Sequence, residues 1–103
     1  MPKEINQDEI NQQAMQQLFL DARSHNAWLD KPVSEAQIRH LYDITKMGPT
    51  SANSCPARFV FVTSDQAKQK LKACLDEGNV EKSMSAPAVA IIAMDMEFYE
   101  KLP

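Results

Sequence analysis

Two short polar segments carry the residue types best suited to binding an anionic, ring-bearing molecule. The first contains Arg23 and Ser24, a permanent cation beside a hydroxyl, and continues through His25 to Asn26. A guanidinium forks onto phosphate oxygens, and a neighbouring hydroxyl adds a further donor. This segment is therefore a candidate for holding a phosphate group without a glycine-rich loop.

The second polar segment lies between Pro49 and Pro56. Thr50 and Ser51 offer hydroxyls, and the carboxamide of Asn53 both donates and accepts, as the edge of a flat heterocycle requires. Ser, Thr and Asn also dominate ordinary turns for local reasons. On residue type alone, turn chemistry is the stronger interpretation of both segments.

The remaining titratable residues form no self-contained catalytic set. Ser24 beside His25 is no nucleophile–base pair, because adjacent side chains rarely meet productively and no orienting acid is evident. His40 is expected on the outer face of a helix. Cys55 and Cys74 lie 19 residues apart with no CxxC spacing, so we expect buried small side chains and no metal site.

Composition predicts one small globular domain. The 103 residues are 44% hydrophobic and 24% charged, and a net charge of -3 argues against a nucleic-acid partner. The longest uncharged apolar run covers 9 residues, 86–94, whereas a membrane helix needs about 20. The N-terminus lacks the pattern of a signal peptide, so we expect reduced thiols, a cytoplasmic location and no membrane partner.

Apolar spacing and capping residues predict the helices that position these segments. A first helix is expected over 6–22 with Asn6 as its cap. A second begins at a capping box formed by Ser34 and Gln37. It is expected to end at Gly48 in the left-handed conformation that follows many helices.

Two apolar runs predict strands over 57–62 and 88–94, both buried on both faces. Because two strands make a marginal sheet, further strands are expected from outside this sequence. Between the two runs, a helix capped by Ser64 or Asp65 is expected to end at Gly78. Its outer, solvated face is expected to carry the three lysines Lys68, Lys70 and Lys72.

Two shorter elements complete the prediction. A helical turn is expected over 80–85, before the second strand. A short terminal helix is expected over 96–102. The elements between 33 and 94 thus alternate helix, strand, helix, strand. This order by itself favours a parallel, right-handed crossover between the strands.

At its two polar segments, the sequence resembles the FMN-dependent nitroreductase family. The family pattern R-R-S-x-R-x-F corresponds here to Ala-Arg-Ser-His-Asn-Ala-Trp at 22–28. The pattern P-S-S-x-N-x-Q-P corresponds to Pro-Thr-Ser-Ala-Asn-Ser-Cys-Pro at 49–56, and Ala-Pro precedes an apolar strand at 86–87. From about Asn11 onward, the sequence is similar to one branch of this family, which contains malonic semialdehyde reductases and NADH dehydrogenase/NAD(P)H nitroreductases.

The resemblance implies an α+β fold, a three-layer α/β/α sandwich with a central, mainly antiparallel sheet. Residues 1–103 would be the N-terminal part of that single domain, one helix–strand–helix–strand unit of a truncated or fragmentary chain. It implies FMN as cofactor and NADH or NADPH as reductant. Hydride would pass through flavin N5 in a ping-pong reaction to a small-molecule substrate such as malonic semialdehyde, a quinone or a nitro compound.

The resemblance also implies roles for individual residues. Arg23 and Ser24 would contact the FMN phosphate or ribityl chain, and Asn26 replaces a basic residue of the family pattern beside them. A second set would approach the flavin of the partner subunit in a homodimer, namely Thr50, Ser51 and Asn53. No catalytic residue is assigned, and Cys55, where many members have Gln, receives no role.

The alternative reading is a catalytically inactive fragment. Such a chain would act only as a module that associates with copies of itself through its exposed sheet edges. We expect the 103-residue chain alone to bind FMN poorly or not at all.

Overall fold

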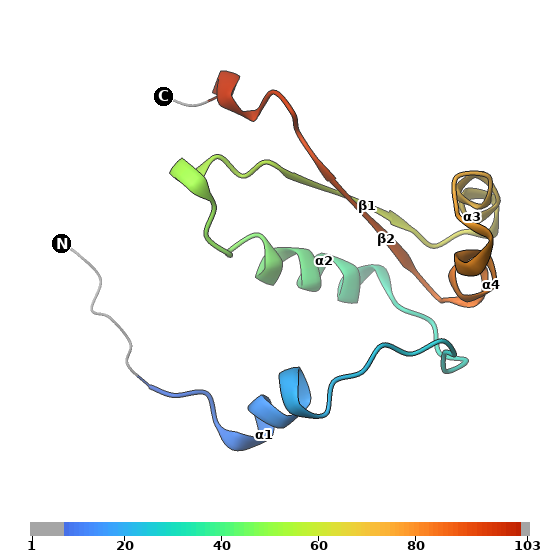
Figure 1. Cartoon of the computed structure of the whole chain (residues 1–103), viewed down its shortest axis with the longest axis horizontal. Coiled ribbons are helices and arrows are strands. Elements are labelled where there is room, and N and C mark those ends of the chain that lie inside the picture. Colours follow the sequence, from blue (N-terminus) through green and yellow to red (C-terminus); the bar gives the residue numbers. More distant parts are fainter. Residues whose placement is uncertain (1–7, 102–103) are drawn as a thin grey trace.

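A computed structural model describes residues 8–101, which form an α+β arrangement (Figure 1). Among these residues, no helix is long and apolar enough to cross a membrane. Four α-helices, two strands and three short irregular helices follow in this order: α1 (Gln12–Met15), η1 (Gln16–Leu20), α2 (Glu35–Thr45), η2 (Ser51–Asn53), β1 (Ala57–Val62), α3 (Asp65–Lys72), α4 (Glu77–Ser85), β2 (Val89–Met94) and η3 (Phe98–Lys101).

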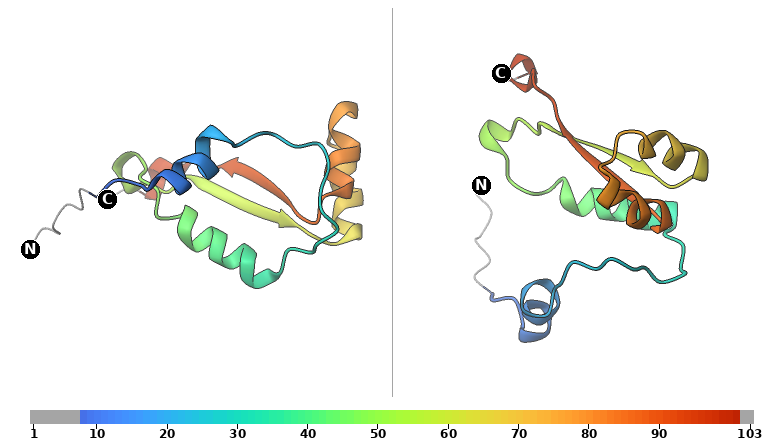
Figure 2. Two further views of the ribbon diagram at one scale, coloured as in Figure 1. Left: turned by 90° about the horizontal axis from the view of Figure 1, so that it is seen from below. Right: turned by 45° about the vertical axis from the view of Figure 1, so that its right-hand side comes forward.

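The two strands pair directly in an antiparallel ladder that runs from Ala57 opposite Met94 to Val62 opposite Val89. The bounds of β1 agree with the prediction, and β2 begins one residue later than expected. The antiparallel direction confirms what the family resemblance implied and overturns the parallel crossover that element order favoured. The two helices α3 and α4 connect the strands and lie side by side at one end of the ladder (Figure 2).

Burial of both strands on both faces was wrong for the described chain. Val62 is buried, but Val60 and Ile92 leave 54% and 71% of their surface exposed. The reason is that only two strands are present in residues 8–101, so no further strand shields their side chains there. Their apolar faces are therefore largely open to solvent.

Helix α2 begins as predicted. The hydroxyl of Ser34 accepts from the backbone N–H of Gln37 at 3.1 Å, and the Gln37 side chain accepts from the N–H of Ser34 at 2.9 Å. Its end differs, because the helix stops at Thr45 and Gly48 has no positive φ. The N–H of Gly48 donates to the carbonyl of Thr45 at 3.1 Å, so a right-handed turn continues where a left-handed cap was expected.

The N-terminal helix is shorter than predicted. The cap is Asn11, whose side chain accepts from the N–H of Ala14 at 2.9 Å, while Asn6 lies outside the described residues. The helix then widens into a π-helical turn, closed by a bond of 2.8 Å from the N–H of Asp21 to the carbonyl of Gln16. Its apolar side chains are exposed, including Phe19 at 66%.

Helix α3 is capped by Ser64, whose hydroxyl accepts from the N–H of Ala67 at 3.1 Å, as one of two predicted alternatives. It ends at Lys72, before Gly78, which instead lies in the first turn of α4. Asp76 starts that new helix, which covers the predicted turn over 80–85 and extends it toward the N-terminus.

The prediction that Lys68 is solvated was wrong. Lys68 is only 8% exposed, and its ammonium donates to the carbonyl of Ala86 at 2.6 Å. Ala86 follows the last residue of α4, where helical carbonyls lack partners and a cation is favoured. Lys70 and Lys72 are exposed, as predicted.

The last described element, η3, is a 3₁₀ turn within the predicted terminal helix; Leu102, where that helix was expected to end, lies outside the described residues.

Candidate functional site

The polar loop at 49–56 has an unusual backbone. Ala52 and Asn53 both have φ of 51°, and Cys55 has φ of 49°. Asn adopts this left-handed conformation at little cost, whereas for Ala and Cys it is less favourable by about 1–2 kcal/mol per residue. Strained backbone of this kind persists only where surrounding contacts hold it, and it is found disproportionately at ligand-binding sites.

Hydrogen bonds within the loop hold that backbone. The hydroxyl of Thr50 accepts from the N–H of Cys55 at 3.1 Å, and the carbonyl of Thr50 accepts from the N–H of Asn53 at 3.1 Å. A third bond joins the N–H of Ser54 to the carbonyl of Ser51 at 3.0 Å. The thiol of Cys55 donates to the backbone and side-chain oxygens of Asn53 at 3.6 and 3.8 Å. Two predicted site residues, Thr50 and Asn53, thus shape one structured turn.

The other polar segment follows η1 in an extended conformation. Arg23, Ser24 and Asn26 are all exposed. The guanidinium of Arg23 donates to the carbonyls of Leu20 and Ala22 at 3.2 and 2.6 Å, both times through Nη1. Within the described part of the chain, the other edge of the guanidinium keeps its donors for an outside acceptor.

Trp28 anchors this extended segment to the far end of the molecule. Its indole N–H donates to the carbonyl of Lys82 in α4 at 2.8 Å, across 54 positions of sequence. Close to this contact lies a pocket of about 370 Å³ that is also lined by Lys68 and Ala86. The segment is therefore held against α4 at Trp28.

One copy of the chain does not bring the two polar segments together. The segment with Arg23 runs from η1 to the start of α2, whereas the loop with Asn53 leaves from the other end of α2 (Figure 1). The cofactor-binding roles of the six predicted residues stay predictions.

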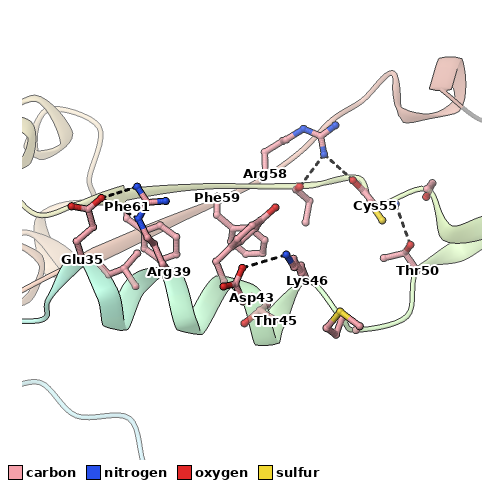
Figure 3. A pocket seen from close by; sticks show the side chains of 16 residues that line it. Glu35, Arg39, Asp43, Thr45, Lys46, Thr50, Cys55, Arg58, Phe59 and Phe61 are labelled. Carbon is pink, nitrogen blue, oxygen red and sulfur yellow. Dashed lines mark hydrogen bonds and ion pairs between the residues drawn. The ribbon is translucent and has the colours of Figure 1, made fainter.

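A groove of about 1150 Å³ lies between α2 and β1 (Figure 3). Tyr42 of α2 meets Phe59 of β1 edge to face, with ring centroids 5.9 Å apart, and Phe59 stacks near Phe61. Thr50 and Cys55 line the same groove at the end where the strained loop joins β1. An apolar wall thus continues into the polar loop.

Charged residues on α2 border this groove as exposed pairs. Arg39 meets Glu35 at 2.7 Å, and Lys46 meets Asp43 at 3.3 Å. Pairs this exposed contribute little to stability because solvent screens them. The two pairs place both positive and negative side chains along the rim of the groove.

Arg58, which the sequence analysis did not single out, is the residue that joins the loop to the sheet. Its guanidinium donates to the carbonyl of Cys55 at 2.8 Å and to Asp95 at 2.9 Å. The sequence did contain a signal that could have identified Arg58, because it is the single charged residue in an otherwise apolar strand.

Both cysteines are exposed and free, so the expectation of buried small side chains was wrong. Their positions explain this: Cys55 lies on the surface loop, and Cys74 lies after the end of α3. Among residues 8–101, no group of three His, Cys, Asp or Glu side chains is arranged to hold a metal ion.

The amino-acid sequence is similar to those of one group of proteins. No protein-family model matches the chain. It is 57% identical over 94 residues, 91% of its length, to a "Putative NADH dehydrogenase/NAD(P)H nitroreductase" of Burkholderia lata. Proteins with the same description from Polynucleobacter asymbioticus and Stenotrophomonas maltophilia are 51% and 58% identical over 94 and 90 residues. The chain is a homologue of these nitroreductase-like proteins.

The similarity covers most of this chain but only part of each relative. The matched residues are 91%, 91% and 87% of the chain, and 48%, 48% and 46% of the three relatives. The chain therefore spans about half the length of the curated relatives that it matches.

Proposed function

We propose that these residues are the N-terminal part of an FMN-dependent NAD(P)H oxidoreductase of the nitroreductase type. The names of relatives at 51–58% identity support a reductase that uses NADH or NADPH. The observation that carries the flavin assignment is the left-handed backbone at Ala52, Asn53 and Cys55. It occurs in the loop that, by the family resemblance, would approach the flavin ring.

The residues present fit an FMN molecule at both of its ends. Arg23 keeps one guanidinium edge for the phosphate, with the hydroxyl of Ser24 and the amide of Asn26 following on the same exposed segment. Asn53 is fixed by its turn and has a carboxamide suited to the ring edge, next to the hydroxyls of Thr50 and Ser51. When bound, FMN supplies the ability to accept hydride from NAD(P)H and pass it to a substrate.

Separation of the two segments supports a homodimeric site. Because the segment with Arg23 precedes α2 and the loop with Asn53 follows it, and one copy does not bring the two together, a site that uses both would be completed by the loop of a second copy. The protein's own residues would bind the phosphate, orient the ring and help to exclude water from it. The proposal includes a cytoplasmic location and an aldehyde such as malonic semialdehyde, reduced to 3-hydroxypropionate, or a quinone or nitro compound as acceptor.

The test is FMN titration of the protein at its full encoded length, followed by visible absorbance of the bound flavin. We expect stoichiometric FMN whose colour bleaches when NADH or NADPH is added without oxygen. Arg23→Ala should raise the Kd for FMN by at least about tenfold, since a charge-assisted hydrogen bond is lost. Lys70→Ala, which removes an exposed cation from α3 away from the groove, should leave the Kd unchanged. A colourless protein, or equal Kd values for both variants, would overturn the assignment.

A second candidate function rests on the exposed strands. The sheet in residues 8–101 has two strands, so each strand keeps one edge without a strand neighbour there, and exposed strand edges recruit other strands. On this reading the chain is an inactive module that associates with itself. Sedimentation of the 103-residue chain without flavin would support this reading if it showed stable oligomers that neither bind FMN nor oxidise NADH.

A further inference from the structure

Arg58 makes three contacts from one half-exposed side chain. Through Nη1 it donates to the carbonyls of Cys55 and Ala57 at 2.8 and 2.9 Å, and through Nη2 to Oδ2 of Asp95 at 2.9 Å. Figure 3 shows the guanidinium directed back at the loop. A planar guanidinium serves several acceptors in a fixed geometry, which a lysine cannot reproduce.

Asp95 is held as firmly as Arg58. Its Oδ1 accepts from the N–H of Glu97 at 2.9 Å, and its own N–H donates to the carbonyl of Pro56 at 2.8 Å. Its side chain is 23% exposed, so this ion pair is better shielded than the two on α2. Asp95, the residue after β2, is thereby fixed against Pro56, the residue before β1.

These bonds meet on Cys55, the last residue of the loop with a left-handed backbone. Its N–H is held by the hydroxyl of Thr50, and its carbonyl by the guanidinium of Arg58. The two peptide planes on either side of a strained residue are therefore both fixed. Only the second of these anchors reaches outside the loop, to the end of β2.

We propose that Arg58 and Asp95 act as a clip that holds the loop at 50–55 in its ligand-binding conformation. Both are positioning residues, because neither belongs to the residues assigned to FMN. The consequence for FMN affinity rests on the proposed function, whereas the effect on the loop does not. Without the clip, the strained turn at Cys55 loses its outside anchor and opens more often.

Amide hydrogen exchange, measured by NMR on the purified protein, tests the clip without any cofactor. In Arg58→Gln, we expect exchange at the N–H groups of Asn53, Ser54 and Cys55 to accelerate by roughly tenfold, because their opening no longer breaks the guanidinium bonds. Arg39→Gln is the matched control: it removes the same charge from an exposed pair on α2 and should leave these rates unchanged. Unchanged exchange of the β1–β2 amides would show that Arg58→Gln remains folded.

Two further variants separate the clip from a general loss of stability. Asp95→Asn should accelerate the same three amides, and combining it with Arg58→Gln should add little, since both remove one interaction. Arg58→Lys should restore only part of the protection, because an ammonium has no planar fork. Additive effects of the two single changes, or loop exchange equal to that of the unaltered protein, would overturn the clip.

Cofactor affinity decides the second half of the proposal. The apparent Kd equals the intrinsic Kd divided by the fraction of molecules whose loop is closed. If the clip sets the loop for FMN, Arg58→Gln raises the Kd for FMN by the factor by which that closed fraction falls, as calculated from the exchange rates. A Kd that does not follow the closed fraction would overturn the positioning role. If the unaltered protein binds no FMN, the proposed function fails, and the exchange rates alone decide the clip.

Discussion

The ammonium of Lys68 donates to the carbonyl of Ala86 at 2.6 Å and thereby ties α3 to the residue that ends α4. Both residues are buried, at 8% and 4% exposure. The contact joins the two helices that connect β1 to β2. It is therefore part of what fixes the end of the antiparallel ladder where Val62 lies opposite Val89.

Replacing Lys68 with Met should lower the free energy of unfolding by about 1–3 kcal/mol. The aliphatic part of the side chain is kept, but the buried carbonyl of Ala86 loses its donor, which carries this cost. Urea unfolding followed by circular dichroism measures the change. Lys70→Met, on the exposed side of the same helix, should change stability by less than about 0.5 kcal/mol. Equal effects of the two changes would contradict this assignment.

Replacing Ala52 with Gly should stabilise the loop. The native φ of 51° costs an alanine about 1–2 kcal/mol, and glycine avoids that cost while losing more entropy on folding. We expect a net gain of about 0.5–1 kcal/mol, seen as a higher thermal midpoint in calorimetry. Ala57→Gly in β1, where the backbone is extended, should lower the midpoint. A lower midpoint for Ala52→Gly would mean that the loop backbone is not strained in solution.

Replacing Ser34 with Ala should shorten or fray α2. The hydrogen bond from the N–H of Gln37 to the hydroxyl of Ser34 is lost, at a cost of about 1 kcal/mol, whereas the backbone N–H of residue 34 keeps its acceptor on the Gln37 side chain. Ser34→Asp keeps a side-chain acceptor and adds a favourable charge at the helix start, so it should retain stability. Helical ellipticity and the urea midpoint measure both variants. Indistinguishable Ala and Asp variants would argue that the cap is not formed.

Local signals in the sequence predicted local structure well. Ser34 and Ser64 cap helices as their neighbours indicated, because a cap depends only on the next few residues. The reading of Gly48 and Gly78 as helix terminators failed. Left-handed conformations occur instead at Ala52, Asn53 and Cys55, in a turn held by hydrogen bonds within the loop and, at Cys55, by the bond from Arg58.

Features that depend on elements far apart in the chain could not be predicted from local sequence patterns. Lys68 has the spacing of a surface lysine, and its burial follows only from where α4 packs. Arg58 and Asp95 are 37 positions apart, so nothing local links them. The residues of the polar loop were singled out by their residue types, and their role toward a flavin stays a prediction.

The bond from Trp28 to Lys82 gives the molecule a built-in optical reporter. Trp28 is the sole tryptophan in the sequence, so all indole emission comes from the junction between the Arg23-bearing segment and α4. Trp28 is already 47% exposed, so a ligand or mutation that detaches this segment would change that emission by breaking the indole hydrogen bond and uncovering the rest of the ring. Events at one end of the chain are thus readable without attaching any label.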